Sequence, residues 1–344
     1  MLVRRMIKPS PARWWLNAVL ERGLLRALIL ITLRCNPRGW KLQHQVGYFL
    51  RLFLPAGLVY FHAVVAYGKA LEDAQALLLG DVLKKNPLYG PCHWEEFFAC
   101  ADERLEVLTE YQSSSLQKAC DNTECGLIRD STSLRRCSGC QVFYYCSVEC
   151  QRNDWEIGHR NACPNHHSVL LSERAALTFC ERSFFRALIH DTYLKERPSI
   201  CVQQIRVLSE YDSAMHIPLL TLFDYCRPLP TISVEPVDPD DAEAQEQLRE
   251  LVDTESAEWQ YILERARLGE GRYQLHAIRV VHGMQETWLK TRSWVVPLRT
   301  DGDAIFAGLR SLAQRMRQGS LVEEDLMGEI DLLLQAEAGI VVIH

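Results

Sequence analysis

The sequence predicts an α+β multidomain protein with a helical N-terminal region, a small cysteine-rich segment and an α+β C-terminal region. Apolar residues recur at helical spacing through the first third of the 344-residue chain, and β-branched residues gather in short runs near its end. Between these parts, seven of the thirteen cysteines lie within Cys120–Cys163. The predicted divisions are a helical region at 1–118, the cysteine-rich segment at 120–163, a helical connector at 166–198 and an α+β region at 199–344.

The first 69 residues are strongly basic. They contain eleven Lys and Arg residues against the single acid Glu21, a local net charge of +10, whereas the whole chain carries −6. An Arg-rich, acid-poor and apolar beginning is typical both of a mitochondrial presequence and of an element that lies on a membrane surface. The many cysteines without a secretory signal indicate a reducing compartment. We therefore expect an intracellular protein, cytoplasmic or nuclear, with mitochondrial targeting left open.

Helical spacing of apolar residues predicts one helix over residues 14–33. The next stretch, Val46–Tyr67, is apolar on nearly every side, with 17 uncharged residues between Arg51 and Lys69. Because this length falls just short of a membrane span, buried helices of a bundle are the favoured interpretation, and membrane association is left open but not favoured. Further helices are expected at 71–82 and 97–108.

The C-terminal part mixes helices and strands. A helix that carries Phe184 and Phe185 on one face is expected to close before Pro198. The proline-rich, acidic segment 227–241 is typical of an exposed linker, and the acidic run 238–246 of a solvated helix start rather than a cation site. Strands are expected at 201–208, 273–281 and 287–296, the last two paired through a loop around Gly283. Amphipathic helices are expected near Ile305–Met316 and Leu326–Leu333.

The cysteine-rich segment offers eight donors for metal ions, grouped in pairs. Structural zinc takes four sulfur or nitrogen donors in a tetrahedron, so eight donors suit two closed sites. Few aliphatic residues lie between the donors, and the segment needs metal in place of a core of its own. We therefore expect two Zn²⁺ ions, with consecutive and interleaved pairing both open. The pairs are Cys120 and Cys125, Cys137 and Cys140, Cys146 and Cys150, and His159 and Cys163.

Local spacing indicates how the pairs are presented. Ser138 and Gly139 form a small knuckle between Cys137 and Cys140. The pairs Cys146 with Cys150 and His159 with Cys163 are each four apart, which places both donors of a pair on one helical face. His166 and His167 could compete with His159, but they rank lower because they lie beyond Pro164.

These residues resemble the MYND-type zinc finger across the whole of 120–163. The resemblance rests on Cys137-Ser138-Gly139-Cys140, Tyr145-Cys146-Ser147, Cys150-Gln151, Asp154-Trp155, His159 and Cys163. It implies interleaved sites, one zinc on Cys120, Cys125, Cys146 and Cys150 and the other on Cys137, Cys140, His159 and Cys163. Four residues separate Cys120 from Cys125 where the family commonly has two, so this turn must be wider. The arrangement around the finger resembles uncharacterised fungal MYND-domain proteins.

The resemblance implies a protein-interaction module that takes short proline-containing peptides. Gln151 and Trp155, four apart on one helix, would place an aromatic wall beside an amide, which suits an extended proline-rich ligand. The alternative is that Trp155 only covers the zinc sites as a local core residue. Nucleic acid is not expected as a partner, because the finger with its two ions carries a net charge of about −4 and lacks a basic face.

No catalytic signature is visible, and we expect a protein that is not an enzyme. The methyltransferase SET domain found around some MYND fingers is not recognised, because Asn165-His166-His167-Ser168 lacks its cysteine and lies too close to the finger. Zinc sites closed by four protein ligands have no open position for water. His276 and His282 are interpreted as core or solvent-facing histidines. The alternative is an enzyme of unrecognised type with its active site in 199–344, which a pocket of convergent ionisable groups would favour.

Overall fold

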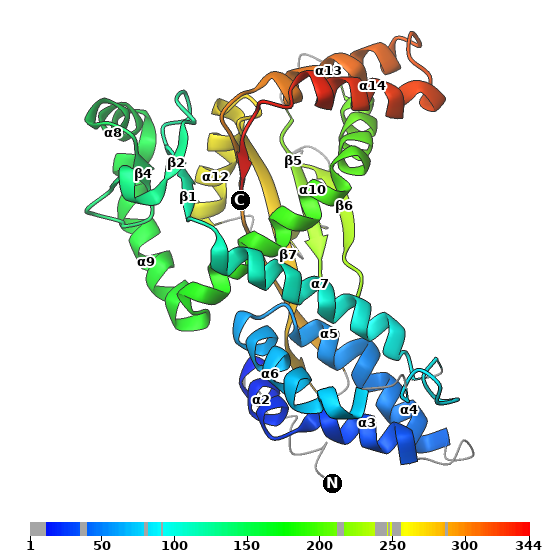
Figure 1. Cartoon of the computed structure of the whole chain (residues 1–344). Helices are drawn as coiled ribbons and strands as arrows, with labels where there is room; N and C mark the ends of the chain where they lie inside the picture. The colour runs from blue at the N-terminus through cyan, green and yellow to red at the C-terminus, as the bar shows by residue number, and fades with distance from the viewer. Residues whose placement is uncertain are drawn as a thin grey trace.

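The helical N-terminal region is present in the computed structural model, which describes residues 12–34, 40–78, 82–90, 92–211, 217–237, 246, 248–249, 256–285 and 288–344. Figure 1 shows its helices gathered at one end of the molecule. They are α2 (Ala12–Glu21), α3 (Leu24–Arg34), α4 (Trp40–Tyr48), the π-helical turn η1 (Phe49–Phe53), α5 (Leu54–Gly57), α6 (Phe61–Leu78) and α7 (Trp94–Ser113).

The single helix predicted for 14–33 is wrong, because Gly23 divides it into α2 and α3. Gly23 has φ +88°, a left-handed conformation that glycine adopts without steric cost. Its N–H donates to the carbonyl of Leu20 at 3.0 Å and closes the end of α2. Residues 35–39, which follow the predicted helix, lie outside the described residues.

The apolar stretch Val46–Tyr67 is packed into the protein as buried helices, as predicted. Leu54, Leu58, Val64 and Tyr67 are at most 1% exposed. Among the described residues, no helix combines the length and apolar character that crossing a bilayer requires. Burial of these apolar side chains stabilises the fold of the N-terminal region, to which its repelling basic groups do not contribute.

Helix α10 (Phe179–Glu210) corrects two predictions at once. The helix does not close before Pro198, and the strand predicted for 201–208 is its last two turns. A capping box between Thr178 and Glu181 starts it, and side chains before and after the proline are buried, so packing outweighs the missing N–H of Pro198. The boundary predicted between 198 and 199 therefore falls inside one helix.

A six-stranded mixed sheet forms the centre of the C-terminal region, in the order β10-β9-β7-β5-β6 with β8 also on β7. The predicted strands 273–281 and 287–296 are confirmed as the antiparallel pair β7 and β8, although the pairing continues past Gly283 to Gln285 and Trp288. Strands β5 and β7 are parallel, and the other pairs are antiparallel. The strands are β5 (Leu219–Asp224), β6 (Thr231–Pro236), β7 (Tyr273–Gln285), β8 (Trp288–Val295), β9 (Leu298–Thr300) and β10 (Val342–Ile343).

The linker expected at 227–241 is wrong in its centre, where β6 pairs with β5 over six residues. As an edge strand, β6 tolerates Pro236 at its end, where one N–H is missing from the ladder. Of the acidic run 238–246, only Glu246 lies within the described residues.

The largest core joins the N-terminal helices to α10 and the sheet. Tyr60 of the segment before α6 donates its hydroxyl to the carbonyl of Val281 in β7 at 2.8 Å, and Phe185 of α10 packs against Trp294 of β8. The two predicted C-terminal helices are confirmed as α13 (Ala304–Arg317) and α14 (Glu323–Ala336), which pack on the second half of α10. Helix α12 (Ala257–Leu268), which was not predicted, packs on β7 beside the cysteine-rich segment.

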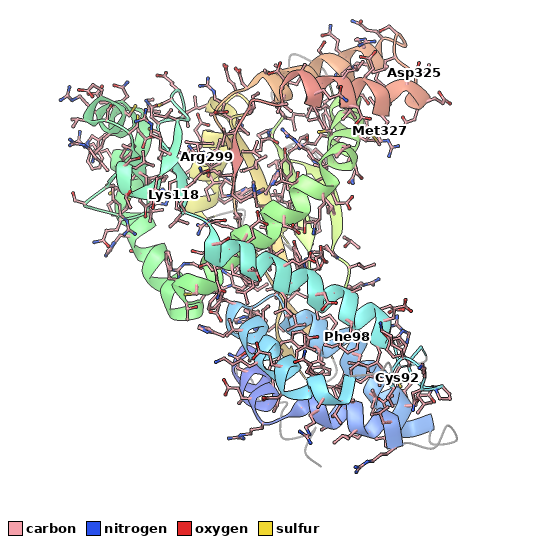
Figure 2. All side chains as sticks on the ribbon, in the orientation of Figure 1. Cys92, Phe98, Lys118, Arg299, Asp325 and Met327 are labelled. Atoms are coloured by element: carbon pink, nitrogen blue, oxygen red, sulfur yellow. The ribbon has the colours of Figure 1, made fainter. Side chains whose placement is uncertain are left out.

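The cysteine-rich segment forms a lobe beside the sheet, between α7 and α10 in the chain (Figure 1). Figure 2 labels Lys118 of β1 and Arg299 of β9 where this lobe meets the C-terminal region. Its elements are β1 (Gln117–Ala119), β2 (Ile128–Asp130), the 3₁₀ turn η3 (Ser131–Ser133), β3 (Arg135–Arg136), β4 (Tyr144–Tyr145), α8 (Val148–Asp154), the π-helical turn η4 (Trp155–His159) and α9 (Arg160–Ala176).

Candidate metal centre

The first group of donors is built from two separate turns of the chain. The ligand atoms of Cys120, Cys125, Cys146 and Cys150 all lie within 4.8 Å of one another. The Sγ atom of Cys146 is 3.7 Å from that of Cys125 and 3.5 Å from that of Cys150. Cys120 is buried, whereas the other three are half-buried. This group is therefore the more accessible of the two.

The wide turn between Cys120 and Cys125 is held by Asn122. Its side-chain oxygen accepts from the N–H of Glu124 at 3.2 Å, and its carbonyl accepts from the N–H groups of Cys125 and Gly126. Gly126 has φ +60°, and a Cβ there would come 3.2 Å from the carbonyl oxygen of Thr300. The longer spacer is thus accommodated by a hydrogen-bonded turn that lies against the C-terminal region.

The second group, Cys137, Cys140, His159 and Cys163, is completely buried. The Nε2 atom of His159 lies 3.4 Å from the Sγ of Cys137 and 3.6 Å from that of Cys140, and the Sγ atoms of Cys137 and Cys163 are 3.9 Å apart. Position 139 has no room for a side chain, because a Cβ there would come 2.8 Å from the Sγ of Cys163. The Ser138-Gly139 knuckle thus lies directly over the fourth ligand.

The donor sets fit zinc. Four sulfurs about 2.3 Å from one ion in a tetrahedron lie about 3.8 Å apart, close to the separations found in both groups. The same separations are far longer than a disulfide bond, and all seven cysteine donors are free thiols. Burial raises the pKa of the Cys140 and Cys163 thiols, so a cation is needed to hold them as thiolates. Each group thus makes a complete four-ligand site, one Cys₄ and one Cys₃His.

The structure interleaves the pairs and excludes the consecutive arrangement. The first and third pairs make one group, and the second and fourth make the other. Cys146 does not share a helical face with Cys150 as expected, because it precedes the cap Ser147, whose hydroxyl accepts from the N–H of Cys150 at 3.1 Å. His159 ends η4, and Cys163 follows one turn later in α9.

His166 and His167 stand outside both donor groups. The ring of His166 is buried between Phe143 and Tyr261, with centroids 4.9 and 4.8 Å away, and stacks on His159 at 6.2 Å. Burial lowers the pKa of His166 to about 4, so this imidazole is neutral at pH 7. It covers the second site as part of its apolar wall.

A buried ion-pair network, which the sequence did not predict, attaches the finger to helix α12. Asp154, buried at the end of α8, accepts from the hydroxyl of Tyr145 at 2.5 Å and from Arg265 of α12 at 2.8 Å. Arg265 also donates to the carbonyl of Asp121. Its guanidinium lies over the ring of Phe143 at 4.9 Å. Asp154 belonged to the quoted motif, but nothing in the sequence pointed to its partner 111 residues away.

Two further arginines bond to the turn that carries Cys120 and Cys125. Arg299 of β9 donates to a carboxylate oxygen of Asp121 at 2.6 Å and to the carbonyl of Cys120 at 2.7 Å, and Arg272 donates to the carbonyl of Glu124 at 2.7 Å. The carbonyls next to the first zinc site are therefore satisfied by the C-terminal region. The finger is joined to that region by charge-assisted hydrogen bonds.

The predicted peptide-binding pair lies on the outer side of α8 and η4. Trp155 is 39% exposed, and its ring meets that of His159 edge to face at 5.6 Å. Gln151, one turn earlier, is half-buried. Val148 and Ile157 are exposed on the same short helical segment, at 41% and 50%. Trp155 therefore both covers a zinc ligand and presents aromatic surface to solvent.

The fold of the lobe and its two four-ligand sites define a two-zinc, cysteine-rich finger. Residues 120–163 match the family model of the MYND finger, which covers all eight donors. This segment is therefore a MYND-type zinc finger that holds two zinc ions, and it makes the protein a zinc-binding protein with a module for contacts to other proteins. No curated protein and no solved structure matches the chain.

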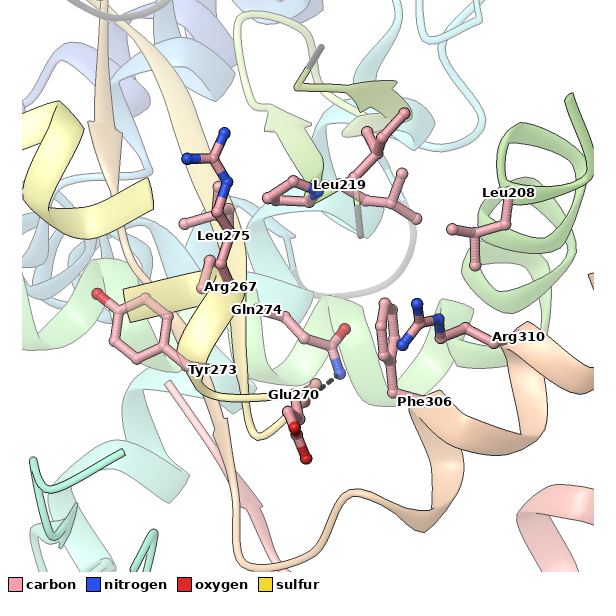
Figure 3. Close-up of a pocket in the computed structure, with 13 residues that line it drawn as sticks. Leu208, Leu219, Arg267, Glu270, Tyr273, Gln274, Leu275, Phe306 and Arg310 are labelled. Atoms are coloured by element: carbon pink, nitrogen blue, oxygen red, sulfur yellow. Dashed lines mark hydrogen bonds between the residues drawn. The ribbon is translucent and has the colours of Figure 1, made fainter. Parts of the chain in front are cut away.

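The C-terminal region contains a small pocket that opens to solvent (Figure 3). Its walls come from the end of α10, the start of β5, the turn between α12 and β7, and α13. Arg267, Glu270 and Arg310 are its charged lining residues, and Gln274 donates to the carbonyl of Gly271 at 3.1 Å. The remaining lining is mainly apolar, with Leu208, Leu219 and Phe306 among it. Its lining contains no Ser, Cys, Lys or His side chain.

His276 lies in the core rather than at a site. It is fully buried in β7, with its Nδ1 atom 2.8 Å from Nε2 of His344, whose Nδ1 atom lies 3.3 Å from Nδ1 of His190. The rings of Tyr193 and Phe223 enclose it at 5.4 and 5.3 Å. His282 is half-buried in the same strand, 6.0 Å from the ring of Trp294.

Proposed function

We propose that the MYND finger binds short proline-containing segments of other proteins through Gln151 and Trp155, and that the chain acts as an adaptor without a catalytic centre. The observation that carries this proposal is the exposed ring of Trp155 on a rigid, metal-bound base. Extended proline-rich segments dock on exposed aromatic rings because their backbone is already ordered before binding.

The base of this surface supports the proposal. Trp155 contacts the zinc ligand His159, and the preceding residue Asp154 is fixed by Tyr145 and Arg265. A binding ring held in this way loses little conformational entropy when a ligand arrives. The amide of Gln151, one turn away, can donate to or accept from the peptide backbone.

The binding test uses the full-length, zinc-loaded protein on an array of proline-containing and scrambled peptides, with fluorescence anisotropy for the hits. We expect Trp155→Ala to weaken the hits at least tenfold, because a central aromatic anchor contributes on the order of 2 kcal/mol or more. Zinc content, measured by mass spectrometry, should stay at two ions per chain, since Trp155 is not a ligand.

Phe179→Ala provides the matched control. Phe179 is an exposed aromatic residue at the start of α10, 60% exposed and outside the finger, so its loss should leave binding unchanged. Equal binding by Trp155→Ala and the wild type, with zinc intact, would remove the peptide surface from the proposal while leaving the zinc sites in place.

The alternative of an enzyme in 199–344 has its best location in the pocket of Figure 3. Two arginines and one glutamate lie on its walls, but no serine, cysteine, lysine or histidine nucleophile or base accompanies them. This composition is closer to a binding cavity than to a catalytic one. Turnover of any substrate that is lost on Arg310→Ala but kept on Trp155→Ala would favour the enzyme over the adaptor.

A further inference from the structure

The described helices α2, α3 and α4 lie together at one end of the molecule and carry exposed basic side chains. Figure 1 places α2, α3 and α4 at the end opposite α13 and α14, and away from the finger. The first 69 residues of the sequence contain eleven Lys and Arg residues and one acid. Within the described residues, the exposed arginines of this region take no part in the zinc sites or in the surface around Trp155. This concentration of charge therefore indicates a separate interaction.

The outer face of α3 is the clearest basic surface. Arg26 and Arg34 lie two helical turns apart on one side of the helix, and Arg22 lies in the turn that precedes α3. All three are exposed, whereas the opposite side is buried in the core through Leu25 and Leu28. Within the part of the chain that the structure describes, none of the three arginines has an acidic partner in an ion pair.

Apolar side chains are also exposed on the neighbouring helix. Helix α4 follows α3 and contacts it, and its residues Leu42 and Tyr48 are 38% and 39% exposed. Arg51 is exposed one turn after Tyr48. Exposed guanidinium groups on one helix, together with exposed leucine and tyrosine on the next, suit the boundary of a bilayer, where phosphate headgroups meet the first methylene groups.

We propose that this surface attaches the protein to the face of a membrane rich in anionic phospholipids, without crossing it. The basic N-terminal surface consists of Arg22, Arg26, Arg34, Leu42, Tyr48 and Arg51. A lipid surface fits better than nucleic acid, because exposed leucine and tyrosine gain from the apolar side of the headgroup layer and not from a phosphate backbone in water. The finger then faces away from the membrane.

The experiment is co-sedimentation of the full-length protein with vesicles of phosphatidylcholine, with and without phosphatidylserine. We expect binding only to the anionic vesicles, weakened by salt. The triple variant Arg22→Glu, Arg26→Glu and Arg34→Glu should bind at least tenfold more weakly, because each basic residue near an anionic surface contributes on the order of fivefold. Circular dichroism checks that these exposed substitutions leave the helices intact.

Two controls separate the proposal from general charge effects. Arg129→Glu, Arg135→Glu and Arg152→Glu change the net charge equally on the exposed surface of the finger and should bind vesicles like the wild type. Leu42→Ser with Tyr48→Ser keeps the charge and should make binding more sensitive to salt. The proposal is overturned if the wild type ignores phosphatidylserine, if the finger variant loses as much, or if the protein binds duplex DNA in place of the vesicles.

Discussion

Gly139 has its place in the second zinc site because it lacks a side chain. A Cβ at this position would lie 2.8 Å from the Sγ of Cys163. Since the knuckle backbone is held by the neighbouring ligands Cys137 and Cys140, the added atom would displace Cys163 from the donor group. We expect Gly139→Ala to reduce the zinc content from two ions per chain to one, measured by mass spectrometry of the native protein.

Gly328→Ala is the control for that change. Gly328 lies in α14 with nothing within 4 Å of its added Cβ, so alanine should raise helix stability by about 1 kcal/mol and leave both ions bound. Two zinc ions in Gly139→Ala would show that the knuckle can move aside.

Arg265 of α12 is the buried side chain that joins the finger to the C-terminal region. It is 3% exposed and bonds to Asp154 and to the carbonyl of Asp121. Removing one partner of a buried ion pair leaves the other charge without compensation, which costs about 3–5 kcal/mol. We expect Arg265→Met to lower the free energy of unfolding by that amount in urea titrations with zinc present. The exposed pair of Arg315 with Glu329 serves as control, and Arg315→Met should leave the urea midpoint nearly unchanged.

At the scale of elements, three imidazoles lie together: His276 of β7 is fully buried, and His190 of α10 and His344, directly after β10, are half-buried. Burial lowers the pKa of His276 to about 3 and also lowers those of His344 and His190. Around them lie Tyr193 and Phe223, and the charge of Arg186 also disfavours protonation of His344. His276 is therefore neutral in the folded protein at neutral pH and protonates readily only when the protein unfolds.

The sign of the resulting pH dependence follows directly. An unfolded histidine protonates below about pH 6.5, so stability is fully present above that pH and falls as the pH decreases toward 3. We expect His276→Gln to remove up to about 1.4 kcal/mol of that loss per pH unit. Urea titrations between pH 7 and pH 4.5 measure it, with the exposed His44→Gln as control. The same slope in both variants would contradict the assignment.

The elements differ in how far local sequence determines them. The zinc ligands could be predicted because donor type and spacing are local, although their interleaving came from family resemblance and not from spacing. Residues 201–208 carry β-branched side chains but form helix, since Cys201, Gln204 and Ile205 are buried at helical spacing against α13 and the sheet. The edge strand β6 was hidden by prolines that an internal strand would exclude. Arg265 and Arg299 could not be predicted, because their partners are more than 100 residues away.

At the scale of the whole molecule, the zinc sites and the C-terminal region support each other. Arg299 and Arg272 bond to carbonyls of the turn between Cys120 and Cys125, and Arg265 to that of Asp121. Loss of zinc would disorder that turn and leave three buried or half-buried cations without acceptors. We expect a chelator to increase hydrogen exchange in 120–163 and also in 261–275 and 298–300, measured by mass spectrometry.

Helix α3 is the internal control for this experiment. It packs in the N-terminal part of the main core and lies away from the finger (Figure 1), so exchange in 24–34 should stay unchanged on chelation. A change confined to 120–163 would mean that the finger unfolds alone. A change throughout the chain would mean that zinc supports the whole fold.

The buried Arg265 has a geometric consequence for anything the protein recruits. With its guanidinium locked between the finger and α12, the finger cannot pivot on a hinge as modules on flexible tethers do. If both proposals hold, a peptide captured at Trp155 would be oriented relative to the basic N-terminal surface, and a partner would be displayed at a set height and angle above the lipid.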